Sequence, residues 1–173
     1  FRRYFIMMLH NIRVVLSHTS HPGNIGAAAR AMKTMGLSRL CLVNPKRFPD
    51  AAADAMASGA TDVLADAVVC TSLDEALQGA VLVVGLTARK RDLSHAMLTL
   101  REAAPQILAR AGEAPVALLF GTEMSGLSNV ELEKCQMLIT IPVNPEYGSL
   151  NLAAAVQVVA YELRSCEIPV PPA

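Results

Sequence analysis

The chain has 173 residues, enough for one domain with a substantial hydrophobic core. Hydrophobic residues make up 53% of it and charged residues 17%, a composition that excludes an intrinsically disordered protein. The formal net charge is zero, which argues against a protein that binds nucleic acid through overall positive charge alone.

The first residues, FRRYFIMML, are basic and then apolar, but no small-residue cleavage site follows them. We interpret residues 1–7 as a tag remnant or an N-terminal extension, not as a signal peptide. No apolar run is long enough to span a membrane without interruption. The cysteines lie in apolar segments and form no C-x-x-C pair, which favours reduced, buried thiols in a cytoplasmic protein.

Short apolar segments alternate with helical segments along the chain. Strands are predicted at residues 12–16, 40–43, 67–70, 80–84, 116–120 and 137–141. Helices are expected at residues 26–35, 51–58, 72–78, 100–111, 128–134 and 150–165, two of them with capping boxes at Ser72 and Ser128. This alternation predicts an α/β protein with a largely parallel six-stranded sheet and helices on both faces.

The last predicted helix, LNLAAAVQVVAYEL, is apolar around most of its circumference, so it must be covered on more than one side. A central core helix and a subunit interface are the two alternatives, and we favour a homodimer. Charge is also uneven: residues 1–49 hold eight Lys and Arg and no acidic residue, whereas residues 111–173 hold two basic and seven acidic residues. Such segregation can give a neutral protein one basic face.

Several common sites find no support in the sequence. The G-x-G-x-x-G fingerprint is absent, and GTEMSGLS (residues 121–128) lacks the lysine of a P-loop and carries Glu123, whose carboxylate would repel a phosphate. His18 and His21 have H-x-x-H spacing, but no cluster completes a metal site, so we expect no metal. There is no G-x-S-x-G elbow, and Ser149 has no evident histidine partner.

Three loops that follow predicted strands are the remaining candidates, at residues 85–89, 121–126 and 142–151. The carboxyl ends of strands are where open α/β sheets bind ligands. These loops are rich in small residues, which expose backbone N–H and C=O groups. Such a site suits an uncharged ring such as adenine better than a polyphosphate.

Three motifs of the chain resemble those of the SPOUT RNA methyltransferases. PGNIGAAAR (residues 22–30) is similar to their first motif, LFGTEMSGL (residues 119–127) to their second, and IPVNPEYGSLNLAAA (residues 141–155) to their third. The likeness covers roughly residues 11–165. It is strongest with members that methylate the ribose 2′-hydroxyl of cytidine or uridine at position 32, in the anticodon loop of tRNA.

The resemblance implies a sheet whose C-terminal segment is threaded into a deep trefoil knot, a homodimer, a tRNA substrate and S-adenosylmethionine as cofactor. Residues 8–168 would be the methyltransferase domain, and residues 169–173 would begin a Pro-rich linker to a C-terminal extension that helps to bind tRNA. Without that extension we expect weak, strongly salt-dependent tRNA binding.

By the same resemblance, residues of the three loops would bind the cofactor: Leu86, Thr87, Ala88, Gly121, Ile141, Gly148, Ser149 and Leu150. Relatives often carry Thr or Ser at the position of Leu86 and Ser at that of Gly148, so a hydroxyl contact would be lost at each. Glu123 is expected to tie loop amides together. Ser149 is also a candidate N-cap of the last helix.

Arg30 and Ser149 would be the catalytic residues, with Arg30 supplied from the partner subunit's side of the site. Its guanidinium stays protonated, so we expect it to act by charge and position and not as a base. Asn24, Arg30 and Arg89 would contact RNA. We expect PGNIG to form a turn whose backbone donors bind an RNA phosphate at the start of a helix.

Three alternatives stay open at this point. The chain could be a SPOUT enzyme that acts on another tRNA position or on rRNA, since the sequence contains no independent indication of the RNA target. It could be an RNA-binding module without activity, which the presence of Arg30 and of all three loops disfavours. A nucleotide-binding dehydrogenase is opposed by the missing glycine fingerprint.

Overall fold

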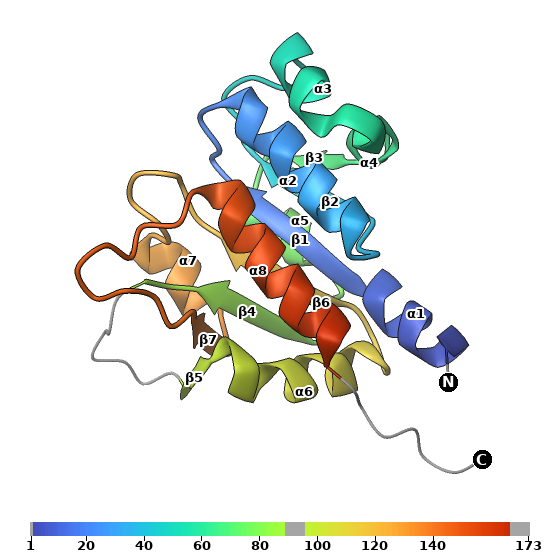
Figure 1. Cartoon of the computed structure of the whole chain (residues 1–173), viewed down its shortest axis with the longest axis vertical. Coiled ribbons are helices and arrows are strands. Elements are labelled where there is room, and N and C mark those ends of the chain that lie inside the picture. The colour runs from blue at the N-terminus through green and yellow to red at the C-terminus, as the bar shows by residue number, and fades with distance from the viewer. Residues whose placement is uncertain (1, 89–95, 167–173) are drawn as a thin grey trace.

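A seven-stranded sheet forms the centre of the computed structural model, which describes residues 2–88 and 96–166. The strand order is β3-β2-β1-β6-β4-β7-β5, and every pair of neighbours is parallel (Figure 1). The strands are β1 (Ile12–Ser17), β2 (Arg39–Val43), β3 (Val68–Cys70), β4 (Leu82–Leu86), β5 (Ala96–Thr99), β6 (Val116–Phe120) and β7 (Met137–Thr140). The prediction of an α/β protein with a parallel sheet is therefore confirmed.

The sheet has one strand more than expected, and one predicted strand is displaced. β5 lies at the sheet edge, where it pairs only with β7. Its sequence AMLT contains residues that favour helices as much as strands, so nothing local indicates it. β4 begins and ends two residues later than predicted, so Leu86 is its last residue and not part of the following loop.

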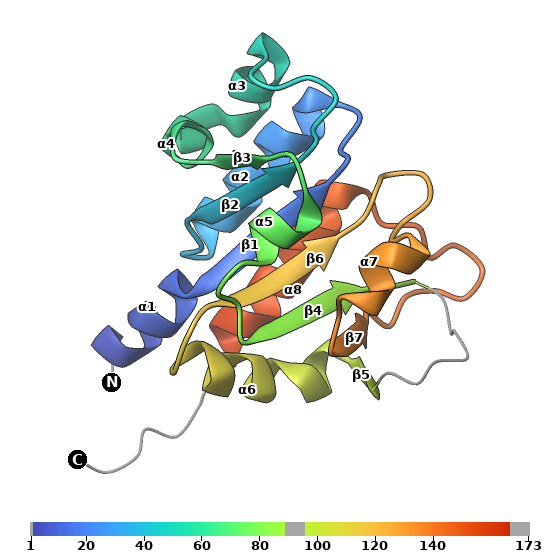
Figure 2. The same ribbon diagram turned by 180° about the vertical axis from the view of Figure 1, so that it is seen from behind.

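Helices cover both faces of the sheet and create two hydrophobic cores (Figures 1 and 2). One face carries α1 (Arg2–His10), α2 (Pro22–Thr34), α6 (Leu100–Ala111) and α8 (Leu152–Ser165). The other face carries the short helices α5 (Leu73–Leu77) and α7 (Asn129–Glu133). Side chains alternate between the two cores along each strand, as Val14 and Val15 do in β1. Burial on both faces explains why these strands are continuous apolar runs.

The remaining helices extend the layer around α2. α3 (Ala51–Ala57) packs on α2, and it is followed by a 3-10 turn, η1 (Ser58–Ala60), and by α4 (Thr61–Ala65). The sequence analysis predicted a helix only to Ser58 and no element at residues 59–66, so α4 was missed. Residues 2–10 form a helix whose Met8 and Leu9 are buried. The domain boundaries inferred from the sequence stay a prediction. No helix in the described part of the chain is long and apolar enough to cross a membrane.

The capping boxes and cysteines largely follow expectation. Ser72 caps α5, and Ser128 forms a full capping box with Glu131 at the start of α7. Three of the cysteines are buried, and burial raises the pKa of the Cys135 thiol to about 12. Cys166 differs, because it is only half-buried at the end of α8.

The start of α2 differs from the sequence prediction. Residues 22–26 are not a turn before a helix, because Pro22 already occupies the first helical position. A Cβ built on Gly26 would lie 2.0 Å from the carbonyl oxygen of Ala53, so α2 and α3 are in direct backbone contact there. Gly26 is thus required by the close packing of two helices.

We expect Gly26→Ala to destabilise the protein by about 2 kcal/mol, because the methyl group would force the two backbones apart. This cost exceeds the roughly 1 kcal/mol that alanine gains over glycine inside a helix. Urea unfolding followed by circular dichroism measures the change. Gly59→Ala is the matched control, since a Cβ there meets no atom within 4 Å. Equal stability of the two variants would contradict the packing argument.

Candidate functional site

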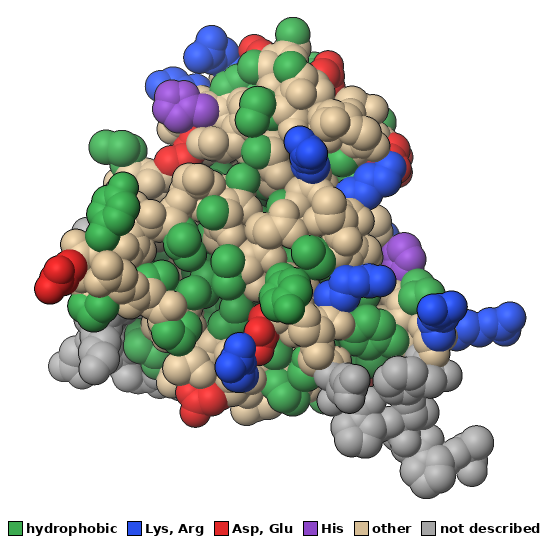
Figure 3. Space-filling view, in the orientation of Figure 1, with side chains coloured by type: hydrophobic (Ala, Val, Ile, Leu, Met, Phe, Trp, Pro, Cys, Tyr) green, Lys and Arg blue, Asp and Glu red, His purple; other side chains and the backbone are tan. Residues whose placement is uncertain are grey.

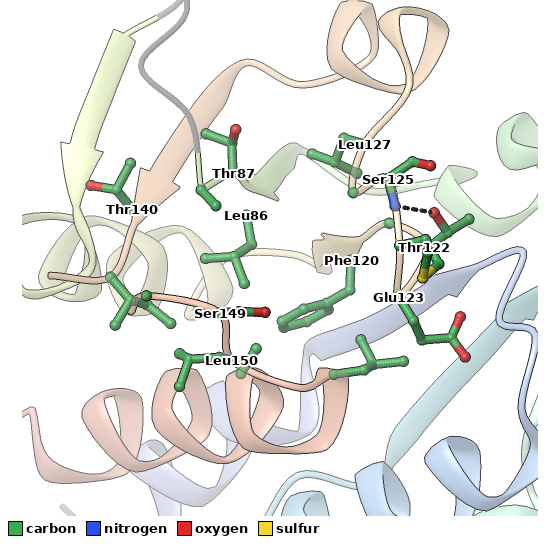
Figure 4. Close-up of a pocket in the computed structure, with 18 of the residues that line it drawn as sticks. Leu86, Thr87, Phe120, Thr122, Glu123, Ser125, Leu127, Thr140, Ser149 and Leu150 are labelled. Atoms are coloured by element: carbon green, nitrogen blue, oxygen red, sulfur yellow. Dashed lines mark hydrogen bonds between the residues drawn. The ribbon is translucent and has the colours of Figure 1, made fainter. Parts of the chain in front are cut away.

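A cavity of about 270 Å³ lies at the carboxyl ends of β4, β6 and β7 (Figure 4). Its volume is near the lower end of small-molecule sites, roughly 300–1,000 Å³. All the residues that the sequence reading assigned to the cofactor line it: Leu86, Thr87, Ala88, Gly121, Ile141, Gly148, Ser149 and Leu150. The three loops therefore converge on one site, as parallel strand pairing requires.

The loop after β6 forms one wall of the cavity, and it is tightly closed. Thr122 and Gly126 pair through two backbone hydrogen bonds, and the Ser125 amide donates to the Thr122 hydroxyl at 3.1 Å (Figure 4). A Cβ on Gly121 would lie 2.1 Å from the carbonyl carbon of Gly126. Only glycine permits this closure, because the opposing atom belongs to backbone.

Glu123 connects this wall to the beginning of α2. Its carboxylate accepts hydrogen bonds from the backbone N–H groups of Ser20 and His21 and from the Asn24 side-chain amide, at 2.9 to 3.1 Å. In Figure 4 the carboxylate points away from Ser149, toward the other side of the view. Glu123 therefore ties loop amides together, although across to α2 and not within its own loop.

These hydrogen bonds decide the charge state of Glu123. Partial burial by itself raises the pKa of the carboxyl. The hydrogen bonds from Ser20, His21 and Asn24 together outweigh burial, so the pKa lies below its ordinary value. The side chain is ionised at neutral pH.

The same contacts bear on the predicted phosphate site. The backbone N–H groups of Ser20 and His21, which precede α2, donate to a carboxylate. A phosphate at these two donors would have to displace Glu123 and would meet its negative charge. The backbone donors predicted to bind the phosphate belong to residues 22–26 and are not among these, so the phosphate contact of that segment stays a prediction. The Asn24 side-chain amide also donates a hydrogen bond to the Glu123 carboxylate.

Of the two predicted catalytic residues, one lines the cavity and the other does not. Ser149 lines it, in the loop that leads into α8 (Figure 4). The N-cap of α8 is Asn151, whose side chain accepts from the Ala154 amide, so the alternative that Ser149 caps this helix is wrong. Arg30 is exposed on α2 and does not line the cavity of its own chain. Arg89 falls outside the described residues.

The sequence reading missed about half of the cavity. Phe120 and Thr140 end their strands, so the rule about strand ends could have found them. Leu152 and Ala155 are one helical turn apart on α8 and both line the cavity, which periodicity alone does not reveal. The other lining residues that were not predicted are Thr122, Glu123, Met124, Ser125, Gly126, Leu127 and Val143.

The lining defines what the cavity can bind. Among the described residues, Glu123 is the one charged residue that lines it, and its carboxylate is engaged by the segment before α2. Hydroxyls come from Thr87, Thr122, Ser125, Thr140 and Ser149, and the remainder is aliphatic, aromatic or backbone. An uncharged ring system with a hydroxyl-bearing sugar fits such a lining, whereas a polyphosphate does not. Within residues 2–88 and 96–166, no group of three or more His, Cys, Asp or Glu could hold a metal ion.

Comparison with protein families decides the relationship. Residues 11–161 match the SpoU rRNA Methylase family. The chain belongs to this family. The resemblance to SPOUT methyltransferases that the three motifs carry is thereby confirmed.

Individual SpoU family members agree. The chain is 58% identical over 157 residues to the tRNA (cytidine/uridine-2′-O-)-methyltransferase TrmJ of Sodalis glossinidius. The matched segment covers 91% of this chain and 62% of that protein. A probable methylase family protein from Haemophilus influenzae superimposes with a TM-score of 0.86 at 51% identity, over 90% of this chain and 66% of the other. TrmJ from Z. mobilis gives 0.85 at 40% identity, over 90% and 69%. The chain thus spans less than two thirds of the Sodalis relative.

For this SpoU family member, we expect Glu123→Gln to lower the free energy of unfolding by about 1 kcal/mol at neutral pH, because the donors lose a charged acceptor. The folded pKa of Glu123 is lowered, so its contribution is fully present above the unfolded value of about 4.3. It is lost as the pH falls through the folded value. Urea unfolding at several pH values measures this.

Glu113→Gln is the matched control, because Glu113 is exposed and its side chain makes no hydrogen bond to any described residue. This variant should match the parent protein throughout. A Glu123→Gln deficit that persists unchanged in acid would show that the carboxylate charge is not what stabilises the contact.

Proposed function

We propose that the chain is the catalytic domain of an S-adenosylmethionine-dependent methyltransferase that methylates the ribose 2′-hydroxyl of cytidine or uridine at position 32 of the tRNA anticodon loop. The observation that carries the proposal is the convergence of all eight predicted cofactor residues on one cavity. The identity to TrmJ relatives supports the reaction and the tRNA substrate. The resemblance of the three sequence motifs of the chain supports position 32 over other targets.

The chemistry of the cavity suits this cofactor. When bound, S-adenosylmethionine supplies an electrophilic methyl group on a positively charged sulfur. The apolar and backbone lining from Leu86, Ile141 and Leu150 would hold the adenine, and the hydroxyls would face the ribose. No described residue places a cation in the cavity that would repel the sulfonium. This lining agrees with the absence of a dinucleotide fingerprint in the sequence.

Catalysis in this proposal requires positioning and charge, not a protein nucleophile. The cofactor's methyl group would pass to the ribose oxygen and its sulfur would become neutral, so no metal would be needed to stabilise a leaving group, and the chain's own residues would only bind and orient the nucleotide. Arg30 would orient the attacking nucleotide and stabilise charge on its oxygen and the adjacent phosphate. The proton passes to a phosphate oxygen or to water. Ser149 would hold the reacting groups from the cavity side.

A homodimer completes the proposed site. Arg30 does not line the cavity of its own chain, so a second subunit would have to bring it there. The outer face of α8 offers an interface: Ala153, Ala154, Gln157 and Val158 are only half-buried, and Tyr161 is 57% exposed. A tRNA substrate would make the enzyme cytoplasmic. The C-terminal trefoil knot stays a prediction from the resemblance.

We expect S-adenosylhomocysteine to bind with micromolar affinity, about 8 kcal/mol, and NADH not to bind. Ala155→Leu should weaken binding at least about tenfold, because Ala155 is buried against the cavity and the larger side chain fills it. Ala109→Leu, on the exposed side of α6, is the control and should leave the affinity unchanged. Isothermal titration measures all three proteins. Binding of NADH, or of neither ligand, would refute the methyltransferase proposal.

Arg30→Ala should reduce methyl transfer to tRNA by roughly 100-fold or more, because positioned charge at the reacting oxygen is lost. Arg30→Lys should recover only part of the rate, since lysine keeps the charge but not the planar fork. Transfer of a labelled methyl group measures the rate, and titration with S-adenosylhomocysteine should show unchanged affinity. Arg3→Ala removes an exposed arginine of α1 and should be fully active. An active Arg30→Ala enzyme would exclude the assigned role.

A further inference from the structure

Among the described residues, most basic side chains have a partner within the chain. Three form ion pairs with carboxylates: Lys33 with Asp62, Arg101 with Glu162, and Lys134 with Asp74. Four more donate to backbone carbonyl oxygens: Arg13, Arg39, Arg110 and Arg164. Among the described residues, the Lys and Arg side chains with no such partner are Arg2, Arg3, Arg30, Lys46 and Arg47.

Lys46 and Arg47 lie together in the exposed loop between β2 and α3. Figure 3 shows basic side chains gathered with a histidine at the upper end of the molecule, over the start of α2 and this loop. Because β2 is parallel to β1 and β6, its loop leaves the same edge of the sheet as the loops that form the cavity.

Hydrogen bonds connect this loop to the cavity wall in two steps. The Lys46 backbone N–H donates to the Thr19 carbonyl oxygen at 3.0 Å, and the next residue, Ser20, donates to the Glu123 carboxylate. Glu123 in turn lines the cavity. The position of the two cations relative to the cavity is therefore set by backbone contacts and not by a free loop.

Nearby carboxylates do not neutralise these cations directly. Asp50, three residues after Arg47, caps α3 by accepting from the Ala52 amide at 2.8 Å. Glu123 is engaged by Ser20, His21 and Asn24. Two adjacent, exposed, unpaired cations beside a cavity whose described lining holds no cation complement a polyanion whose reacting part is uncharged.

We propose that Lys46 and Arg47 bind the ribose-phosphate backbone of the RNA substrate next to the nucleotide that enters the cavity. The inference rests on the proposed function and adds an RNA contact that the three motifs do not contain. The contact is electrostatic, so it contributes affinity and register without reading the base.

The test is tRNA binding by a Lys46→Ala/Arg47→Ala variant. Fluorescence anisotropy with unfractionated tRNA, between about 50 and 200 mM salt, gives both the affinity and its salt dependence. We expect binding about tenfold weaker at low salt, and a slope of log affinity against log salt that is smaller by about one to two. Titration with S-adenosylhomocysteine and thermal unfolding should both match the parent protein.

Arg2→Ala/Arg3→Ala is the matched control. It also removes two adjacent unpaired cations, but from α1, which precedes β1 at the opposite edge of the sheet (Figure 1). The control should bind tRNA like the parent protein. Equal losses in both variants, no loss in the Lys46→Ala/Arg47→Ala variant, or no tRNA binding by the parent at low salt would each overturn the proposal.

The experiment also separates this surface from the proposed function. If S-adenosylhomocysteine fails to bind while the Lys46→Ala/Arg47→Ala variant still loses tRNA affinity, the RNA surface stands and the methyltransferase proposal fails. If instead the variant keeps its tRNA affinity but loses binding to polyglutamate, the surface serves an acidic protein partner and the RNA proposal is wrong.

Discussion

Parallel pairing of all seven strands is the constraint on which the rest of the molecule depends. In a parallel sheet every strand ends at the same edge, so loops from distant parts of the chain must meet there. The loops after β4, β6 and β7 meet in the cavity, and the loops after β1 and β2 lie beside it. Because helices bury both faces, this edge is where the sheet can present a site.

Much of this arrangement could be predicted from the sequence, for a physical reason. Strands buried on both faces are uninterrupted apolar runs, and six of the seven strands were predicted from their apolar sequence, although β3 exposes Val68 and Val69. β5 escaped because its Ala, Met and Leu carry little strand preference, and its place is fixed by pairing with β7, far along the chain. The residues predicted to bind the cofactor came from the motif resemblance, which identifies loop positions that no periodicity marks.

The errors share a cause: local rules do not include the neighbour in space. The glycines of PGNIG suggest a turn, yet Gly26 lies inside α2. The residue is glycine because the Ala53 carbonyl leaves no room for a side chain. Ser149 and Asn151 are both suitable N-caps by type, and the path of the preceding loop selects Asn151. The N–H groups of Ser20 and His21, just before α2, bind Glu123 from a segment about a hundred residues away, a pairing that no local rule specifies.

The chain has zero net charge, but positive and negative side chains are in different surroundings at the carboxyl ends of the strands. The carboxylates of Asp50 and Glu123 each accept hydrogen bonds from backbone N–H groups next to the start of a helix, where the helix dipole also favours negative charge. Lys46 and Arg47 receive no comparable compensation from any described residue, so they add positive charge to the surface beside the cavity. No described Lys or Arg lines the cavity, and its one charged group among the described residues is the hydrogen-bonded Glu123 carboxylate. Under the proposed function, this pocket beside two exposed cations would separate recognition of an uncharged reacting group from attachment of a charged backbone, which is the division that a nucleotide within an RNA strand requires.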